Sequence, residues 1–161
     1  MKMNKKPKWR TLLPALALPL ATGGLSALLT KNGMAAFEAV RKPPLTPPQW
    51  VFPVVWTGLY ALMGLASYRV YESDASDPRK ERAFRLYGLQ LAMNFAWSII
   101  FFTMRAYLAA FIWLLVMLAV IIAAQVRFRY IDGRAGKYMI PYIIWTVAAA
   151  YLNLGVYILN R

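Results

Sequence analysis

The stretch RKPPLTPPQWVFPVVWTGLY, residues 41–60, sets five prolines against the start of a long apolar segment. Each proline pushes the residue before it out of the helical region, so the pair Pro43-Pro44 predicts an extended entry. Thr46 then fits an N-cap, with the second proline pair in the first helical turn, where a missing N–H costs nothing. Pro53 follows inside the helix and is expected to kink it. The stretch therefore predicts a loop that leads into a helix.

Apolar runs of membrane-spanning length make up most of the remaining chain. Of its 161 residues, 60% are hydrophobic, which is far from the composition of an ordinary soluble domain. A spanning helix needs about 20 mostly apolar residues. Five runs qualify: residues 9–30, 48–68, 84–104, 106–126 and 138–159. We predict an all-α integral membrane protein, a bundle of five transmembrane helices that forms a single domain over residues 1–161.

Two segments admit a second interpretation. The first run follows a lysine-rich start, as a cleaved signal peptide would, but its apolar part is longer than a signal core and contains Pro14 and Pro19. We therefore interpret it as a helix of the mature protein. The loop at residues 31–47 either rests on the headgroups as a surface turn or covers the open end of the bundle as a lid. Met34 and Phe37 share one apolar face, which favours the lid.

Basic residues gather on one side of the predicted membrane. The net charge is +13, but the cations lie in short groups between apolar runs rather than on one amphipathic face. We interpret them as membrane-flanking residues and expect no nucleic-acid partner. The residues on the basic side are Lys2, Lys5, Lys6, Lys8, Arg10, Arg69, Arg79, Lys80, Arg82, Arg85, Arg127, Arg129, Arg134 and Lys137. The positive-inside rule then predicts a cytoplasmic N-terminus in a cell (inner) membrane.

The chemistry available inside the membrane is limited. The chain has no cysteine and no histidine, which removes thiolate ligands, the commonest metal ligand and the commonest general base. Its six acidic residues all fall in predicted loops or near helix ends. Ion-coupled transporters and intramembrane acid–base enzymes keep an ionisable group at membrane depth. We therefore predict no metal site and no required cofactor.

Aromatic and amide side chains share faces of three predicted helices, because residues three or four apart lie on one face. The three faces combine Gln90, Asn94, Trp97 and Phe101; Trp56, Tyr60, Met63 and Ser67; and Tyr142, Trp145, Ala149, Leu152 and Asn153. Each amide alone is explained by hydrogen bonding between helices, and each tryptophan by the core or the aromatic belt. Together they favour a cavity for a flat apolar ligand with a few hydrogen-bonding points.

In three places the chain reads PPLTPPQWVFPVVWTGLYALMG, LQLAMNFAWSIIFF and PYIIWTVAAAYLNLGVYILN. These runs resemble the hallmark segments of the translocator protein family, also called TspO/MBR, tryptophan-rich sensory proteins or peripheral-type benzodiazepine receptors. The resemblance implies a five-helix membrane bundle, commonly dimeric, whose cavity is capped by the first loop. It also implies that the cavity binds porphyrins, sterols and benzodiazepine-type ligands.

The resemblance implies that certain positions in three helices contact the ligand. They are Trp56, Asn94, Trp97, Trp145, Ala149 and Asn153. Phe37 stands where some relatives have a ligand-contacting loop tyrosine, so one hydroxyl is absent here. Tyr60 and Gln90 join the candidate site from the shared faces. A sterol-recognition pattern of relatives matches Leu154, Tyr157 and Arg161 in spacing, although the tyrosine is not where the family alignment would place it.

Three functions are compatible with these residues. We favour a receptor or carrier that binds porphyrin or haem, sterols or similar lipophilic ligands in stress responses or tetrapyrrole regulation. The second is an enzyme that degrades protoporphyrin by light-dependent oxidation, an activity attributed to some relatives, with Trp56 and Trp145 as the redox-active residues. The third is a sterol or lipid transporter. The expected partners are membrane lipids, these small molecules and a second copy of the chain, which would pack through small residues of the first or third helix.

Overall fold

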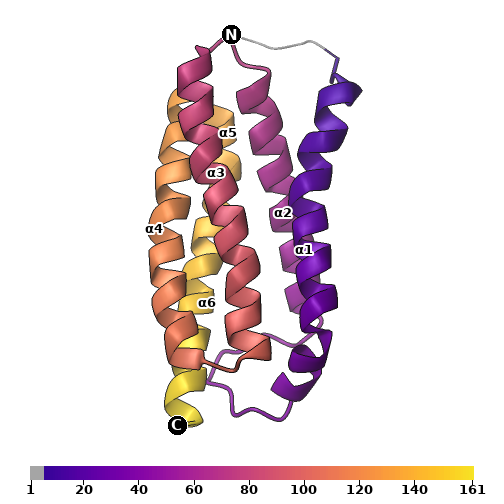
Figure 1. Ribbon diagram of the computed structural model, residues 1–161. Helices are drawn as coiled ribbons and strands as arrows, with labels where there is room; N and C mark the ends of the chain where they lie inside the picture. The colour runs from indigo at the N-terminus through magenta and orange to yellow at the C-terminus, as the bar shows by residue number, and fades with distance from the viewer. Residues whose placement is uncertain (1–5) are drawn as a thin grey trace.

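Five long helices run side by side along the molecule (Figure 1). The computed structural model describes residues 6–161. The long helices are α1 (Trp9–Phe37), α2 (Val51–Tyr71), α3 (Asp77–Ser98), α4 (Tyr107–Ile131) and α6 (Ile140–Leu159). A π-helical turn, η1 (Ile99–Thr103), extends α3, and the short helix α5 (Gly133–Tyr138) precedes α6. Helices account for all the regular secondary structure between residues 6 and 161.

Each long helix, with η1 added to α3 and α5 added to α6, is long and apolar enough to cross a membrane. Large apolar side chains point outward from the bundle, among them Leu28, Val116 and Ile144, which are more than half exposed. Such a surface is suited to lipid chains rather than to water. The prediction of an all-α integral membrane protein with five spanning helices is confirmed.

The helices extend past the apolar runs that predict them. α1 continues to Phe37 instead of ending near residue 30, α3 begins at Asp77 instead of residue 84, and α4 continues to Ile131 instead of residue 126. Hydropathy marks the part of a helix that suits lipid, whereas backbone hydrogen bonding lets its ends continue into water. The segment predicted as a loop over residues 31–47 therefore begins as helix, and the connection to α2 is residues 38–50.

The predicted start of the second helix is wrong. α2 begins at Val51 rather than near residue 48, and the Thr46 hydroxyl donates to the Pro43 carbonyl at 2.6 Å instead of capping a helix. Pro53 is consequently the third residue of α2. In the first turn its missing N–H removes no helical hydrogen bond, so the reason for the expected kink is gone.

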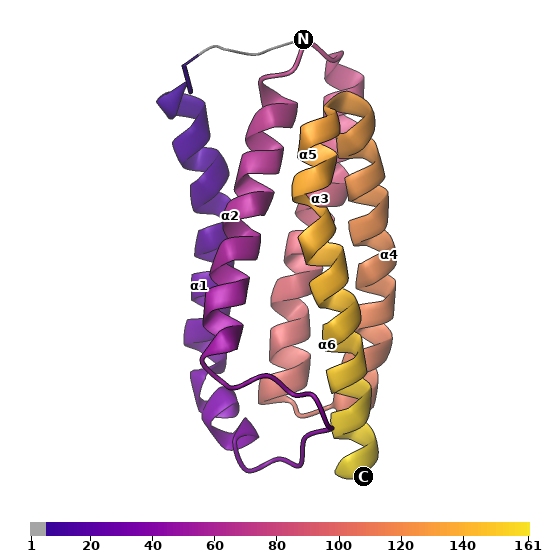
Figure 2. The same cartoon turned by 180° about the vertical axis from the view of Figure 1, so that it is seen from behind.

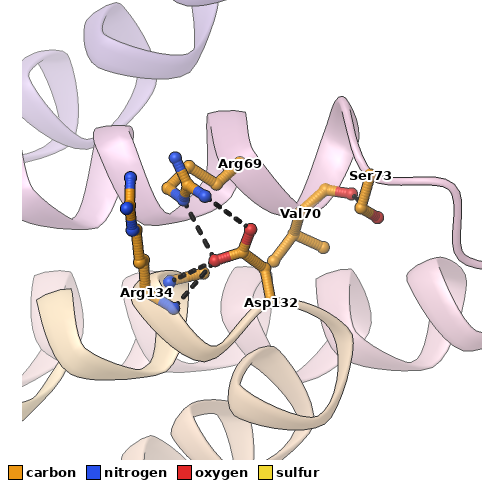
Figure 3. Close-up of polar contacts among 6 residues, drawn as sticks. Arg69, Val70, Ser73, Asp132 and Arg134 are labelled. Atoms are coloured by element: carbon orange, nitrogen blue, oxygen red, sulfur yellow. Dashed lines mark hydrogen bonds and ion pairs between the residues drawn. The ribbon is translucent and has the colours of Figure 1, made fainter. Parts of the chain in front are cut away.

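Ion pairs join the helices at the end of the bundle where α1 begins. Lys8 Nζ lies 2.6 Å from a carboxylate oxygen of Glu72, which ties α1 to the end of α2. Arg69 of α2 donates two hydrogen bonds to Asp132, in the turn between α4 and α5 (Figure 3). Lys8, Arg69 and Arg134 thus lie at one end of the bundle, called here the basic end; Lys2 and Lys5 lie outside the described residues. That this end faces the cytoplasm stays a prediction.

The loop of residues 38–50, called here the lid, crosses the opposite end of the bundle and passes the end of α6 (Figure 2). Asn160 holds it in place: its side-chain amide donates to the Arg41 carbonyl at 2.8 Å, and its side-chain oxygen accepts from the Arg41 N–H at 3.1 Å. The Tyr151 hydroxyl donates to the Pro44 carbonyl at 2.8 Å. The lid is therefore fastened to α6 by hydrogen bonds at two points.

Glycine allows the closest approach between the lid and α6. Pro43 is buried against Gly155, where an added Cβ would lie 2.5 Å from the proline ring. Gly64 allows the same between α1 and α2, because a Cβ there would lie 2.8 Å from the Ala15 carbonyl oxygen. Both contacts are closer than a residue with a Cβ permits, so glycine is needed at both positions for this packing.

Candidate functional site

A cavity of about 810 Å³ lies between the helices and reaches the lid. This volume falls within the range of about 300 to 1,000 Å³ that is typical of small-molecule sites. Side chains from α1, the lid, α2, α3, η1 and α6 line it, and α4, which is described in full, contributes none. Most of the lining side chains are apolar or aromatic, so the cavity suits an apolar ligand.

The π-helical turn brings two consecutive phenylalanines to the cavity. Phe101 and Phe102 of η1 both line it, with ring centroids 4.9 Å apart. Successive side chains diverge less in a π turn than in an α turn, because the π turn holds more residues. Phe37 from the end of α1 meets both rings edge-on at 5.3 and 5.5 Å, and Trp97 stacks on Phe101 at 5.1 Å. These four rings form one aromatic wall.

A second wall comes from α2 and α6. Trp56 stacks on Tyr60 one turn further along α2, with centroids 5.5 Å apart. Phe52 of α2 meets Trp145 of α6 edge-on at 5.8 Å. Ala149 lies one turn after Trp145 on the same helix and also lines the cavity. A small side chain there leaves room for a flat ligand beside the two indoles.

Two asparagines join the helices around the cavity. Asn94 of α3 accepts a hydrogen bond from the Tyr60 hydroxyl at 3.5 Å and donates to the Tyr142 hydroxyl of α6 at 2.9 Å. Asn153 of α6 accepts from the Trp97 indole N–H at 3.1 Å and donates to a backbone carbonyl of α4 at 2.8 Å. Both amides lie at membrane depth, where an unpaired polar group is costly. The two asparagines therefore hold the helices together and also form part of the cavity surface.

The four interior tryptophans differ in what their N–H groups contact. The indole N–H of Trp97 bonds to Asn153, and that of Trp113 bonds to the Met93 carbonyl at 2.9 Å. Neither Trp56 nor Trp145 donates to any other residue in the described part of the chain. Both line the cavity, so their N–H groups and their ring edges are available to a ligand.

Lys42 brings a positive charge to the lid side of the cavity. Its ammonium group donates to the backbone carbonyls of Glu38 and Val40, at 3.0 and 3.2 Å, and lies 4.7 Å from the centre of the Phe37 ring. Glu38 also lines the cavity, but no ion pair joins its carboxylate to Lys42 in the described structure. The mouth therefore presents one cation and one anion beside an otherwise apolar interior.

Most of the residues singled out from the sequence meet at this cavity. Those that line it are Phe37, Trp56, Tyr60, Asn94, Trp97, Trp145, Ala149 and Asn153. Gln90 does not line it: this side chain is completely buried nearer the basic end, with its Nε2 3.8 Å from Met63 Sδ. Its side-chain oxygen has no partner among the described residues. In this structure Gln90 therefore packs between helices outside the cavity lining.

The sequence analysis identified Phe37 and Met34, near the end of α1, but missed the rest of the contribution of this helix. Its lining residues are Gly23, Ser26, Ala27, Thr30, Met34 and Phe37. They share one helical face, so the signal was present, but the small residues from Gly23 to Thr30 resembled a helix-packing surface. Two residues of the sterol-recognition pattern, Leu154 and Tyr157, lie in the last turns of α6 and Arg161 follows it; none of the three lines the cavity.

Comparison of the amino-acid sequence with those of known proteins identifies relatives of this chain. The profile of the TspO/MBR family matches residues 15–159. The chain is 37% identical over 150 residues to the tryptophan-rich sensory protein of Cereibacter sphaeroides, covering 93% of this chain and 89% of that one. It is 32% identical to the tryptophan-rich protein TspO of Archaeoglobus fulgidus, with 92% and 96% covered. It is 31% identical to the human translocator protein, with 94% and 90% covered.

Proposed function

The chain belongs to the TspO/MBR family, and on that premise we propose that it binds porphyrins or similar flat lipophilic ligands in the cavity under its lid. As a receptor or carrier of this kind it would act in stress responses or tetrapyrrole regulation. The observation that carries the proposal is the pair of aromatic walls, one from α1, α3 and η1 and the other from α2 and α6, around a single cavity of about 810 Å³. Sterols and benzodiazepine-type compounds are further candidate ligands of the same site.

Physical chemistry supports a flat aromatic ligand in particular. Each aromatic contact adds about 0.5 to 1.5 kcal/mol beyond the burial of apolar area. The indole N–H groups of Trp56 and Trp145 offer hydrogen bonds to ring nitrogens or oxygens. A porphyrin also carries carboxylates, and Lys42 at the mouth offers a cation for one of them. A ligand oriented in this way has its apolar ring inside and its charged edge under the lid.

A second candidate function is favoured by the same two tryptophans. An indole is easily oxidised, and Trp56 and Trp145 both face the cavity without a bonded N–H in the described structure. Under light, a bound porphyrin could pass its excitation to oxygen and be oxidised beside these side chains. The protein would then be an enzyme of light-dependent protoporphyrin degradation, with Trp56 and Trp145 as its catalytic residues.

Replacing each of these tryptophans by phenylalanine separates the two functions. Trp56→Phe and Trp145→Phe keep most of the apolar surface, so we expect porphyrin affinity to fall by less than about tenfold. For a binding protein, illumination in air should consume bound porphyrin at the same slow rate in both variants and in the wild type. Fluorescence titration measures the affinity, and absorption spectra under light measure the consumption.

Two controls complete the experiment. Trp9→Phe changes an exposed tryptophan far from the cavity, so it should alter neither quantity. Ala149→Phe should fill the space beside Trp145 and weaken binding by at least about tenfold. A photoproduct that only the wild type and Trp9→Phe form, at nearly equal affinity in all tryptophan variants, would overturn the binding role in favour of the enzyme. Undiminished binding by Ala149→Phe would contradict the proposed cavity as the site.

A further inference from the structure

A second cavity lies at the basic end, on the surface between α3 and α4. It has a volume of about 290 Å³ and is lined by Arg79, Arg82, Arg127, Tyr130 and Ile131. The two arginines of α3 are three residues apart and so share a face. The basic half of α3 packs on the last turns of α4, as the ring contacts of Phe128 with Phe84 and Tyr87 show, at 6.0 and 5.4 Å. The fold therefore brings three guanidinium groups from two helices into one cleft.

None of these guanidinium groups forms an ion pair in the described structure. The six acidic residues of the chain are all described, and none lines the cleft. Three of them are engaged elsewhere, Glu72 with Lys8, Glu81 with Arg85 and Asp132 with Arg69. Between residues 6 and 161, no hydrogen bond or ion pair satisfies the side chains of Arg79, Arg82 or Arg127. Like charges in one cleft repel, so an external anion would stabilise the arrangement.

The position of the cleft indicates which anion fits. The apolar run of α3 starts near residue 84 and that of α4 ends near residue 126, so Arg79, Arg82 and Arg127 lie just beyond the apolar runs, at the level where lipid headgroups begin. Arginine binds phosphate through two parallel hydrogen bonds, and its stem lies along apolar surface. Tyr130, which is 82% exposed, adds a hydroxyl, and Ile131 adds an apolar side chain. The guanidinium groups thus lie next to a hydroxyl group and an apolar side chain, which suit the glycerol backbone and the acyl chains of a lipid.

We propose that this cleft binds the phosphate of an anionic glycerophospholipid from the leaflet at the basic end. Basic pockets between transmembrane helices are suited to such headgroups. The site is separate from the cavity under the lid, since the two share no lining residue and lie at opposite ends of the bundle. A lipid held there would join α3 to α4 through its phosphate and reduce the repulsion between their arginines.

Native mass spectrometry in mild detergent tests the proposal with phosphatidylglycerol and phosphatidylcholine of equal acyl chains. The wild type should bind one phosphatidylglycerol at least about tenfold more tightly than phosphatidylcholine. Arg82→Gln with Arg127→Gln should reduce that preference to less than about threefold. The matched control, Arg134→Gln with Lys137→Gln, removes two charges from the same end outside the cleft and should keep the wild-type preference.

The remaining outcomes overturn the proposal. An equal loss in the control pair would show that only general surface charge attracts the lipid. Glycerophosphoglycerol, the same headgroup without acyl chains, should fail to displace the lipid at millimolar concentration; displacement at micromolar concentration would identify a soluble phosphate ligand instead. All four arginines and lysines changed here are exposed, and size-exclusion chromatography of each variant checks that it is folded. A folded cleft variant with an unchanged lipid preference would refute the site.

Discussion

Asp132 connects three parts of the basic end through one carboxylate. Its oxygens accept two hydrogen bonds from Arg69 of α2, at 3.0 and 2.8 Å, and two from the backbone N–H groups of Arg134 and Ala135, at 2.8 and 2.9 Å. It is thereby the N-cap of α5 and the anchor of α2 at once (Figure 3). Burial raises the pKa of Asp132, but the hydrogen bonds from Arg69 and the two backbone groups outweigh burial and hold the pKa below its ordinary value.

Replacing Asp132 by asparagine should destabilise the protein by about 1 to 2 kcal/mol at neutral pH, because charge-assisted bonds are lost at a partly exposed site. The folded-state pKa is lowered, so the contribution of Asp132 is complete above the ordinary value of 3.8 and is lost as the pH falls through the folded-state value. Thermal unfolding in detergent should show a difference between wild type and variant at pH 7 that shrinks as the pH falls below the ordinary value of 3.8.

The exposed pair of Glu81 and Arg85 provides a comparison for that experiment. Both of its side chains are more than half exposed, so Glu81→Gln should change the unfolding free energy by less than about 0.5 kcal/mol. A difference for Asp132→Asn that grew toward low pH, or one no larger than that of Glu81→Gln, would contradict the structural role assigned to Asp132.

At the scale of elements, the lid depends on its contact with α6. Pro43 lines the cavity and also packs on Gly155, so one residue belongs to the cavity wall and to the fastening of the lid. Asn160 and Tyr151 bond to the backbone on either side of it. Displacement of Pro43 would therefore open the cavity and loosen the lid together.

Gly155→Ala tests this contact. The added Cβ would lie 2.5 Å from the Pro43 ring, closer than real side chains allow, so the lid must shift outward. We expect bound protoporphyrin to dissociate at least about fivefold faster, since ligand release depends on lid opening. Stopped-flow fluorescence measures the rate. Gly58→Ala on α2 has no neighbour within 4 Å and should leave the rate unchanged; equal rates in all three proteins would show that the lid does not limit release.

The elements also show what sequence patterns can and cannot predict. The number of spanning helices follows from hydropathy, and the cavity faces of α2, α3 and α6 follow from residues three and four apart. The turn η1 does not follow, because nothing in IIFFT distinguishes a π turn from an α turn, and it decides that Phe102 lines the cavity. Periodicity also does not show that Gln90, on the same face as Asn94, is completely buried outside the cavity lining.

For the whole molecule, the alternation of five spans predicts that the two ends of the chain lie on opposite sides of the membrane. The chain has no cysteine, so a single cysteine introduced at position 8, 76, 134 or 160 would be the only labelled residue and would show on which side of the membrane that position lies. Labelling of intact cells with a membrane-impermeant maleimide should react at position 160 only, if the N-terminus is cytoplasmic. Labelling at 8, 76 and 134 but not at 160 would reverse the orientation, and labelling at all four would contradict five spans.

The assembly state is a further prediction at this scale. Part of the small-residue surface packs within the monomer, since Gly23 faces Tyr60 and Ala83 is completely buried. Ala17, Ala21 and Gly24 on α1 remain exposed. We propose a homodimer in which helices approach closely along such a face. Replacing Ala21 by phenylalanine should shift the protein toward monomer in lipid discs, as measured by mass photometry; a wild type that is monomeric at micromolar concentration would contradict it.

The fastening of the lid by Asn160 has a practical consequence for labelled versions of the protein. Asn160 lies just after the end of α6, and its side chain holds the backbone of Arg41. A fluorescent protein or purification tag joined directly after Arg161 would stand one residue from Asn160, and we expect it to weaken the hydrogen bonds that fasten the lid. Ligand affinities measured with such fusions would describe a cavity whose lid is only partly fastened. A fusion at the other terminus would leave the hydrogen bonds between Asn160 and the lid unchanged.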